Sequence, residues 1–354
     1  MRFLSYAKKN QDLFEITPFN KVDALLMCWV AYFDFSHVKE LPIKFSDLDT
    51  IPEYKKLEPY VSSFFPRFSR KFMHILINSP RFKDTEIIDY KYVLDKEIDA
   101  QFAVVALKVA GIIVIAIRGT DPSYTGWKED FILSYKERIH SYSLAESFVK
   151  KIIDEHNEQI VLCGHSKGGN ICTYLLSQLD DVSRINVVYS FDGPGFRVKG
   201  LFKGKEDRLE KFYKIVPQSS FVGVLFSNET DIHIIKSHNV MMLQHNPFEW
   251  IIKDNDFIYL KKRTLSSRYL EKSINSWIEC LNEKERERFT EIVFGELDKF
   301  DAKDFTVFFK KILLQIKPIY KAYRGLDKAD RKLVNRVMFK LIRNLVKPEK
   351  KLIA

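Results

Sequence analysis

A short apolar run followed by a glycine-flanked serine constrains the fold of this chain more than any other feature. Residues 160–163 are continuously apolar, as in a strand that is buried on both faces. Residues 164–168, Gly-His-Ser-Lys-Gly, fit the pattern G-x-S-x-G, and apolar residues with helical spacing follow from Ile171 to Leu179. A strand, a tight turn and a helix, with serine at the turn, form the context of a nucleophile elbow. The pattern predicts Ser166 as a nucleophile; a structural glycine-rich turn is the alternative.

Further strand patterns surround this motif. Residues 101–117 contain two strand-like runs that are broken at Ala110-Gly111, which predicts a hairpin. Three more short apolar runs follow the motif, at residues 185–191, 212–217 and 232–235. Strands that alternate with helices are typical of a mostly parallel sheet, so we expect an α/β fold with helices on both faces.

Two helices are predicted before the serine motif. Residues 20–35 have helical, amphipathic spacing, with Asn20 as the N-cap and Asp23 in the first turn. Residues 143–146, Ser-Leu-Ala-Glu, form a capping-box pattern, which predicts a second helix from there to about Glu155.

Beyond about residue 255 the pattern becomes helical, and no strand signal returns. Helical periodicity covers four segments, with Pro318 and Gly325 as interruptions: residues 271–280, 283–294, 303–314 and 329–346. We therefore expect two domains, an α/β domain over residues 1–255 and a helical subdomain over residues 256–354.

The positive charge of the chain lies in this helical part. The formal net charge is +10, and residues 261–354 carry +11 of it, which leaves −1 for residues 1–260. Residues 330–346 form a basic amphipathic helix, which could lie on an anionic membrane surface or pack its apolar stripe on the domain. No nucleic-acid-binding motif accompanies it, so we expect no nucleic-acid partner.

The cysteines and the N-terminal residues indicate the cellular compartment and whether a metal or cofactor is expected. The four cysteines form no C-x-x-C and no metal-ligand spacing, which favours reduced thiols and predicts no metal or cofactor. The N-terminus lacks an apolar signal region, and nowhere do 18 apolar residues run together. We expect a cytoplasmic protein, with a peripheral membrane location as a variant.

The end of the second hairpin strand offers candidate oxyanion donors. Residues 118–121 read Arg-Gly-Thr-Asp, and ligands of open α/β sheets bind at the carboxyl ends of strands. Thr120 is expected to supply one donor, its N–H and also its hydroxyl; the alternative is that Arg118 and Asp121 only brace the turn. The second donor should be the backbone N–H of Lys167, the residue after the nucleophile. Its side chain is expected to face solvent or form an ion pair.

The acid of a triad should lie between the serine and the histidine in the chain. Asp192 ends the strand after the serine motif, where a carboxylate could hold a histidine in the correct tautomer. Asp231 and Glu229 are alternative acids. Asp192 could also merely cap a turn, a frequent use of Asp-Gly.

Three histidines follow Ser166 and could act as the base. His245 lies in a loop, where its ring could reach the serine, and it is preferred over His238 at a strand end. His233 should lie within a strand and point into one face. His165 adjoins the nucleophile, but the turn should direct it elsewhere, so we expect a packing role.

Several sequence blocks resemble a known family. VIAIRGTD, GHSKGGN, YSFDGPGF, VPQSSFVG and QHNPFEW, within residues 20–255, resemble a bacterial family of uncharacterised α/β-hydrolases related to the class 3 (triacylglycerol) lipases. The resemblance implies an α/β-hydrolase fold and lipase-like serine hydrolase chemistry, without naming a substrate. Class 3 lipases usually place the acid in an Asp-x-Val/Ile-Pro block, whereas residues 216–219 here read Val-Pro-Gln-Ser.

Three functions are consistent with these residues. The first is a serine hydrolase that cleaves acyl or lipid esters through an acyl-enzyme on Ser166. The second is a catalytically weak α/β-hydrolase scaffold that binds a lipid, a membrane or a partner, which the missing carboxylate favours. The third is acyl transfer to an alcohol by the same residues.

Overall fold

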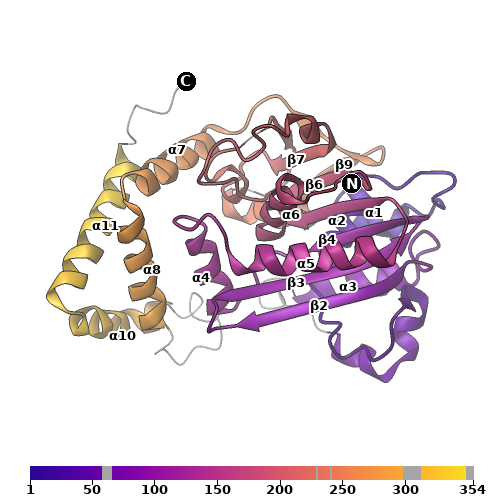
Figure 1. Cartoon of the computed structure of the whole chain (residues 1–354), viewed down its shortest axis with the longest axis horizontal. Coiled ribbons are helices and arrows are strands. Elements are labelled where there is room, and N and C mark those ends of the chain that lie inside the picture. Colours follow the sequence, from indigo (N-terminus) through magenta and orange to yellow (C-terminus); the bar gives the residue numbers. More distant parts are fainter. Residues whose placement is uncertain (58–65, 229, 240, 298–311, 348–354) are drawn as a thin grey trace.

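A nine-stranded sheet forms the centre of the protein (Figure 1). The computed structural model describes residues 1–57, 66–228, 230–239, 241–297 and 312–347. The strands of the sheet, in spatial order, are β1 (Ile43–Lys44), β2 (Glu86–Asp95), β3 (Ala100–Val109), β4 (Ile112–Ile117), β5 (Ile160–His165), β6 (Ile185–Phe191), β7 (Phe212–Pro217), β8 (Ile232–Ile235) and β11 (Tyr259–Leu260). Strands β4 to β8 run parallel, and the outer pairs are antiparallel. The predicted α/β class is confirmed.

The hairpin and the strands around the serine motif lie where the sequence predicts them. Ala110 and Gly111 join β3 to β4 with φ of 51° and 72°, the left-handed backbone that a tight hairpin turn requires. Strand β2 was not predicted. It lies beside the short edge strand β1 and its side chains are mostly half-exposed, so charged residues interrupt its apolar pattern.

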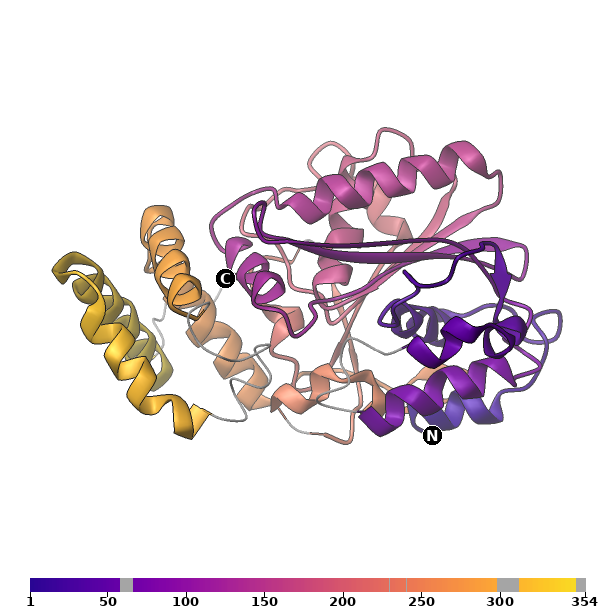
Figure 2. The same ribbon diagram turned by 90° about the horizontal axis from the view of Figure 1, so that it is seen from below.

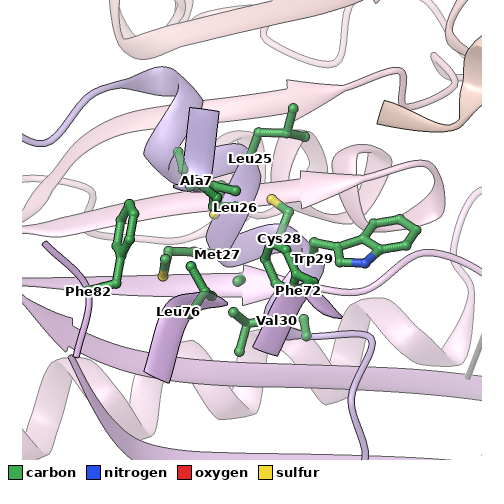
Figure 3. Packing of buried hydrophobic residues seen from close by; sticks show 14 of the residues in the cluster. Ala7, Leu25, Leu26, Met27, Cys28, Trp29, Val30, Phe72, Leu76 and Phe82 are labelled. Atoms are coloured by element: carbon green, nitrogen blue, oxygen red, sulfur yellow. The ribbon is translucent and has the colours of Figure 1, made fainter. Parts of the chain in front are cut away.

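Helices cover both faces of the sheet, which Figure 2 shows edge-on. One face packs against α1 (Phe3–Lys9), α2 (Lys21–Val30) and α3 (Pro66–Ile77), and Figure 3 shows apolar side chains of these helices gathered in one layer. The other face packs against α5 (His140–Glu155) and α6 (Lys167–Gln178). Strand β4 is apolar throughout because its successive side chains enter the two layers in turn.

Helix α2 begins after Asn20, as predicted, but it lacks the exposed face that an amphipathic helix would have over Val22–Val30. The Asn20 side chain accepts hydrogen bonds from the backbone of Val22 and Asp23, and the Asp23 carboxylate accepts one from the Asn20 N–H. Every residue from Val22 to Val30 is buried, including Asp23, which pairs with Arg81 at 2.6 Å.

Helix α5 begins at His140, three residues before the predicted capping box. Its first turn is capped from outside the segment: the Ser141 N–H and hydroxyl donate to the carboxylate of Glu129, at 3.2 and 2.7 Å. Glu129 belongs to α4 (Tyr124–Ile132). The local pattern at Ser143 was therefore misleading, because a distant carboxylate satisfies the helix terminus.

The C-terminal part is mainly helical and lies to one side of the sheet (Figures 1 and 2). Its helices are α7 (Leu265–Glu279), α8 (Glu283–Leu297), α10 (Ile312–Gly325) and α11 (Lys328–Val346). Most of the helix predicted over residues 303–314 lies outside the described residues. Pro318 lies inside α10 rather than between helices. Short strands also follow residue 255, contrary to expectation: β10 (Asp256–Phe257) pairs with β9 (Ile252–Lys253), and β11 joins the main sheet.

Helix α11 packs only part of its apolar stripe. Leu333 and Val337 are buried in a small core with α7 and α8. Met338, Phe339 and Ile342 are 42%, 67% and 57% exposed. Among the described residues, none of the helices combines the length and the apolar composition that crossing a membrane requires.

Short 3-10 helices complete the elements: η1 (Phe45–Thr50), η2 (Pro52–Lys56), η3 (Glu206–Lys211), η4 (Val222–Val224), η5 (Met241–His245) and η6 (Pro247–Glu249). Two of them matter for the site, because η4 and η5 bring the segments after β7 and β8 over the carboxyl end of the sheet.

Candidate active site

Ser166 occupies a strained turn between β5 and α6. Its φ and ψ are 58° and −129°, a combination that L-residues adopt only where the surrounding structure enforces it, at a cost of about 1–3 kcal/mol. The Ser166 N–H donates to the Phe191 carbonyl at 2.9 Å, which ties the turn to the end of β6. This backbone geometry is typical of a nucleophile elbow.

The two glycines of the motif have a packing reason. A Cβ on Gly164 would lie 2.2 Å from the Gly168 carbonyl oxygen, and a Cβ on Gly168 would lie 2.1 Å from that of Ile117. Only glycine therefore lets β5, α6 and the end of β4 approach this closely.

Asp192 and His245 form a hydrogen-bonded pair. The Asp192 Oδ2 lies 2.7 Å from the His245 Nδ1. Asp192 is fully buried and has a φ of 49°, just beyond the end of β6. The His245 side chain is 29% exposed, so one edge of its ring reaches solvent-accessible space. A buried carboxylate on Nδ1 favours the tautomer that leaves Nε2 free to accept a proton.

The segment after β7 supports this carboxylate instead of supplying one. The Asp192 Oδ1 accepts hydrogen bonds from the Ser220 hydroxyl and from the Gly223 N–H, the latter at 3.2 Å. Residues 216–219 lack an acid, and β6 and β7 are neighbouring parallel strands. The carboxylate therefore lies one strand earlier than in the usual class 3 pattern.

The other candidates for acid and base lie elsewhere. Asp231, His233 and His238 are all exposed. The His233 ring does not point into a core but stacks at the surface on Tyr213, with ring centroids 5.7 Å apart. Glu229 lies outside the described residues. The structure thus brings together Asp192 and His245 and leaves the alternatives apart.

His165 holds the loop that carries His245. Its Nδ1 lies 2.8 Å from the Tyr32 hydroxyl, and its Nε2 lies 2.8 Å from the His245 carbonyl oxygen. Burial, with a smaller effect of His245, lowers the pKa of His165 to about 3, so the ring is neutral. The network assigns the proton to Nε2, because that nitrogen must donate to a carbonyl.

Sequence reasoning gave His165 only a packing role. Its partner Tyr32 is 133 residues away in the chain, and a tyrosine at the end of a helix carries no catalytic signature. The spacing of the serine motif therefore could not have revealed this contact.

Thr120 lies next to the serine turn, and its hydroxyl is already engaged. The Oγ1 donates toward both carboxylate oxygens of Asp130, at 2.9 and 2.8 Å. The Thr120 N–H is therefore the stronger candidate donor to an oxyanion. Burial raises the pKa of Asp130 to about 6, while the nearby Lys167 charge and the Thr120 hydrogen bond lower it.

The Lys167 side chain is ion-paired and buried, so the expected alternative of a solvent-facing side chain is wrong. Its Nζ lies 2.6 Å from the Glu129 Oε2 and donates to the Gln101 carbonyl at 2.7 Å. Arg118 and Asp121 also form a buried pair, at 2.9 Å. These contacts anchor the first residue of α6, whose backbone N–H is the second candidate oxyanion donor.

A mainly apolar cavity of about 420 Å³ opens beside these groups. Ser166, His245 and Thr120 line it at the end of the sheet. Its other walls come from α4, α7, α8 and the segment around η4, with side chains that include Phe131, Val222, Leu225, Ile274, Trp277 and Phe289. Cavities of this size accommodate small organic ligands.

No hydrogen bond joins the Ser166 hydroxyl to the His245 ring in the described part of the chain. Catalytic hydrogen bonds are often long before substrate binds and shorten in the complex. No group of three His, Cys, Asp or Glu residues in the described ranges could hold a metal ion.

Comparison with known proteins places these features in context. Residues 76–295 match the family described as Mbeg1-like. No curated protein matches the chain. Among solved structures, the chain is similar to Lip2 lipase from Yarrowia lipolytica, with 17% identity over 56% of this chain and 78% of the lipase, and a TM-score of 0.35. It is also similar to a mutant of MDLA from Penicillium cyclopium, with 13% identity over 67% of this chain and 83% of that protein, and a TM-score of 0.41.

Proposed function

Given that the chain belongs to the Mbeg1-like family, we propose that it is a serine hydrolase that cleaves acyl esters through an acyl-enzyme on Ser166. The observation that carries the proposal is the 2.7 Å hydrogen bond between the buried Asp192 and His245, beside a cavity that His245 and Ser166 both line. A strained serine, a histidine in a fixed tautomer and a buried carboxylate are the groups that this chemistry needs.

The proposed reaction follows from the positions of these groups. His245 Nε2 accepts the hydroxyl proton of Ser166 while the Oγ attacks the ester carbonyl carbon. The backbone N–H groups of Thr120 and Lys167 stabilise the oxyanion. His245 then donates its proton to the departing alcohol, and water attacks the acyl-enzyme by the same steps in reverse order.

The cavity supports an acyl or lipid ester as the substrate class. Aromatic and aliphatic side chains from α4, α7 and α8 dominate its wall, and they would take an acyl chain out of water. Burial of each methylene group in such a site contributes about 0.8 kcal/mol to binding. A short, polar ester would gain little of this energy.

A fluorophosphonate probe tests the proposal. The wild-type protein should be labelled at Ser166, and Ser166→Ala should lose both the label and the hydrolysis of p-nitrophenyl esters while keeping its melting temperature. Ser147→Ala, which changes an exposed serine on α5, is the matched control and should keep both. A wild-type protein that neither labels nor hydrolyses esters would contradict the proposal.

The alternative function is a catalytically weak scaffold that binds a lipid or a partner. The missing hydrogen bond between Ser166 and His245 favours it, and the same labelling experiment separates the two. Acyl transfer uses the same groups and differs only in the acceptor, so product analysis with an added alcohol distinguishes it from hydrolysis.

We also propose that the protein works at an anionic membrane surface, in the cytoplasm. Exposed apolar side chains of α11, with lysines and arginines along the same helix, support this location. All four cysteines are free, which fits a reducing compartment. Phe339→Ser/Ile342→Ser should weaken binding to vesicles that contain phosphatidylserine, whereas hydrolysis of a soluble ester should persist. Equal binding by the double variant would count against the location.

A further inference from the structure

Two arginines line adjoining cavities near the proposed reacting groups. Arg286, on α8, lines the cavity. Arg197 belongs to the loop after β6 and lines a second cavity, of about 320 Å³. The two cavities adjoin, because Leu133 lines both of them, and Pro194 and Gly195 line one each.

Both guanidinium groups are poorly satisfied. The Nε of Arg197 and the Nε of Arg286 are buried and have no hydrogen-bond partner within the described ranges. The Arg286 Nη1 donates to the Ile278 carbonyl over a long distance, 3.4 Å. A buried guanidinium N–H without a partner costs free energy that a bound acceptor would recover.

The carboxylates around this pair are distant and solvated. Arg197 lies 3.5 Å from Glu137 and 4.0 Å from Glu283, whose side chains are 70% and 59% exposed. Ion pairs of this kind contribute little. Glu283 and Arg286 lie one turn apart on α8, so the 4.0 Å contact between Arg197 and Glu283 brings the loop after β6 close to Arg286. Burial and then the charge of Arg197 lower the pKa of Arg286, against the opposing charge of Glu283.

The second cavity adds further positive charge. Lys136 and Arg138 line it together with Arg197; Glu137 is the acid in its lining, and Glu146 lies 3.5 Å from Arg138. The wall of the first cavity is mainly apolar, and Leu133 lines both cavities, so an apolar site adjoins a basic one. This arrangement fits an amphiphile whose chain is apolar and whose other end is anionic.

We propose that Arg197 and Arg286 bind the phosphate of an ester substrate whose acyl chain lies in the apolar cavity, so that the preferred substrates are phospholipid or lysophospholipid esters. This inference rests on the proposed hydrolase function for its catalytic part. Two guanidinium groups from separate elements offer several N–H donors, which suits a tetrahedral phosphate with several acceptor oxygens better than a single carboxylate.

The first test measures selectivity between two esters with the same acyl chain, a monoacylglycerol and the corresponding lysophosphatidic acid. Arg197→Gln/Arg286→Gln should lower the ratio of kcat/KM for the phosphate ester to that for the neutral ester by about 10- to 100-fold, the effect of losing charge-assisted hydrogen bonds. Lys284→Gln, an exposed lysine on the same helix, is the matched control and should leave the ratio unchanged. An unchanged ratio in the folded double variant would overturn the proposal.

The second test measures binding without turnover, by calorimetry on the Ser166→Ala protein. Dodecyl phosphate should bind more tightly than dodecanol, and Arg197→Gln/Arg286→Gln should abolish the difference. If no ester is hydrolysed but this binding is observed, phosphate recognition holds and the hydrolase function fails.

Two results would overturn the proposed substrate class: equal binding of dodecyl phosphate and dodecanol, or binding of inorganic phosphate as tight as that of dodecyl phosphate. Arg286→Lys, which keeps the charge, should retain part of the preference if the glutamine variant does not fold.

Discussion

Replacing Asp192 by asparagine tests the centre of the proposed mechanism. The Asp192 Oδ1 accepts from the Ser220 hydroxyl and the Gly223 N–H, and the Oδ2 faces the His245 Nδ1. The amide oxygen of asparagine can keep the first two contacts. Its NH₂ group must then face His245, because in the opposite orientation the NH₂ group would face the Gly223 N–H, and two donors would oppose each other.

This orientation places a donor against the His245 Nδ1, so that nitrogen must accept and the ring proton moves to Nε2. A protonated Nε2 cannot accept the proton of Ser166. We therefore expect kcat to fall by about 10⁴-fold, or roughly 5.5 kcal/mol of transition-state stabilisation. The native state loses one charge-assisted hydrogen bond, so the free energy of unfolding should fall by only about 1.5–3 kcal/mol.

The assay is hydrolysis of a p-nitrophenyl ester, with kcat and the melting temperature measured on the same preparation. Asp231→Asn is the matched control, because Asp231 is exposed and its substitution removes the same negative charge. Asparagine substitutes well for aspartate in turns, so an Asp192 that only capped its turn would leave turnover nearly normal. That result, or a larger loss in Asp231→Asn, would refute the reasoning.

Three further outcomes are expected. His245→Ala should lower kcat by about 10³-fold or more, whereas His238→Ala, at an exposed position, should change it less than about threefold; equal effects would remove His245 from the mechanism. Tyr32→Phe removes the hydroxyl group that hydrogen-bonds to His165, and it should lower kcat by about tenfold with little change in KM. A lower melting temperature with unchanged kcat would indicate that Tyr32 contributes to packing alone. The pKa of His165 in the folded state, about 3, is below its unfolded value, so its contribution to stability is complete above about pH 6.5 and is lost as the pH falls toward 3. Between pH 7 and pH 5 the stability advantage of wild type over His165→Gln, measured by urea unfolding, should therefore shrink by about 2 kcal/mol, and a constant difference would contradict this.

The sequence predicts those parts of the fold that local patterns determine. Strand β5 is buried at every residue, β6 to β8 are short and mainly apolar, and the glycines around Ser166 mark a close approach of strand and helix, so these features were visible without coordinates. The start of α5 was not, because Glu129 caps it from a separate helix. Strand β2 was missed for a different reason, since an outer strand with half-exposed side chains loses its apolar signal.

The sequence suggested the residues of the candidate site but not their contacts. Order along the chain suggested Asp192 and favoured His245 over His238, but the contact between Asp192 and His245 depends on how the segment after β8 folds back. The roles of His165 and Arg286 were invisible for the same reason. Their neighbours are remote in the sequence: Tyr32 contacts His165, and Arg197 lies 4.0 Å from Glu283, one turn before Arg286.

Two parts of the chain form the cavity wall: one contributes the proposed reacting groups, and the other contributes apolar side chains. The proposed reacting groups lie at the ends of β4, β5 and β6 and on η5 after β8, whereas Ile274, Trp277 and Phe289 come from α7 and α8. Substitutions on these two helices can change the length or shape of the accommodated chain without touching the strand ends. Substrate range and catalytic competence can therefore diverge independently among relatives, with α7 and α8 as the place where new preferences arise.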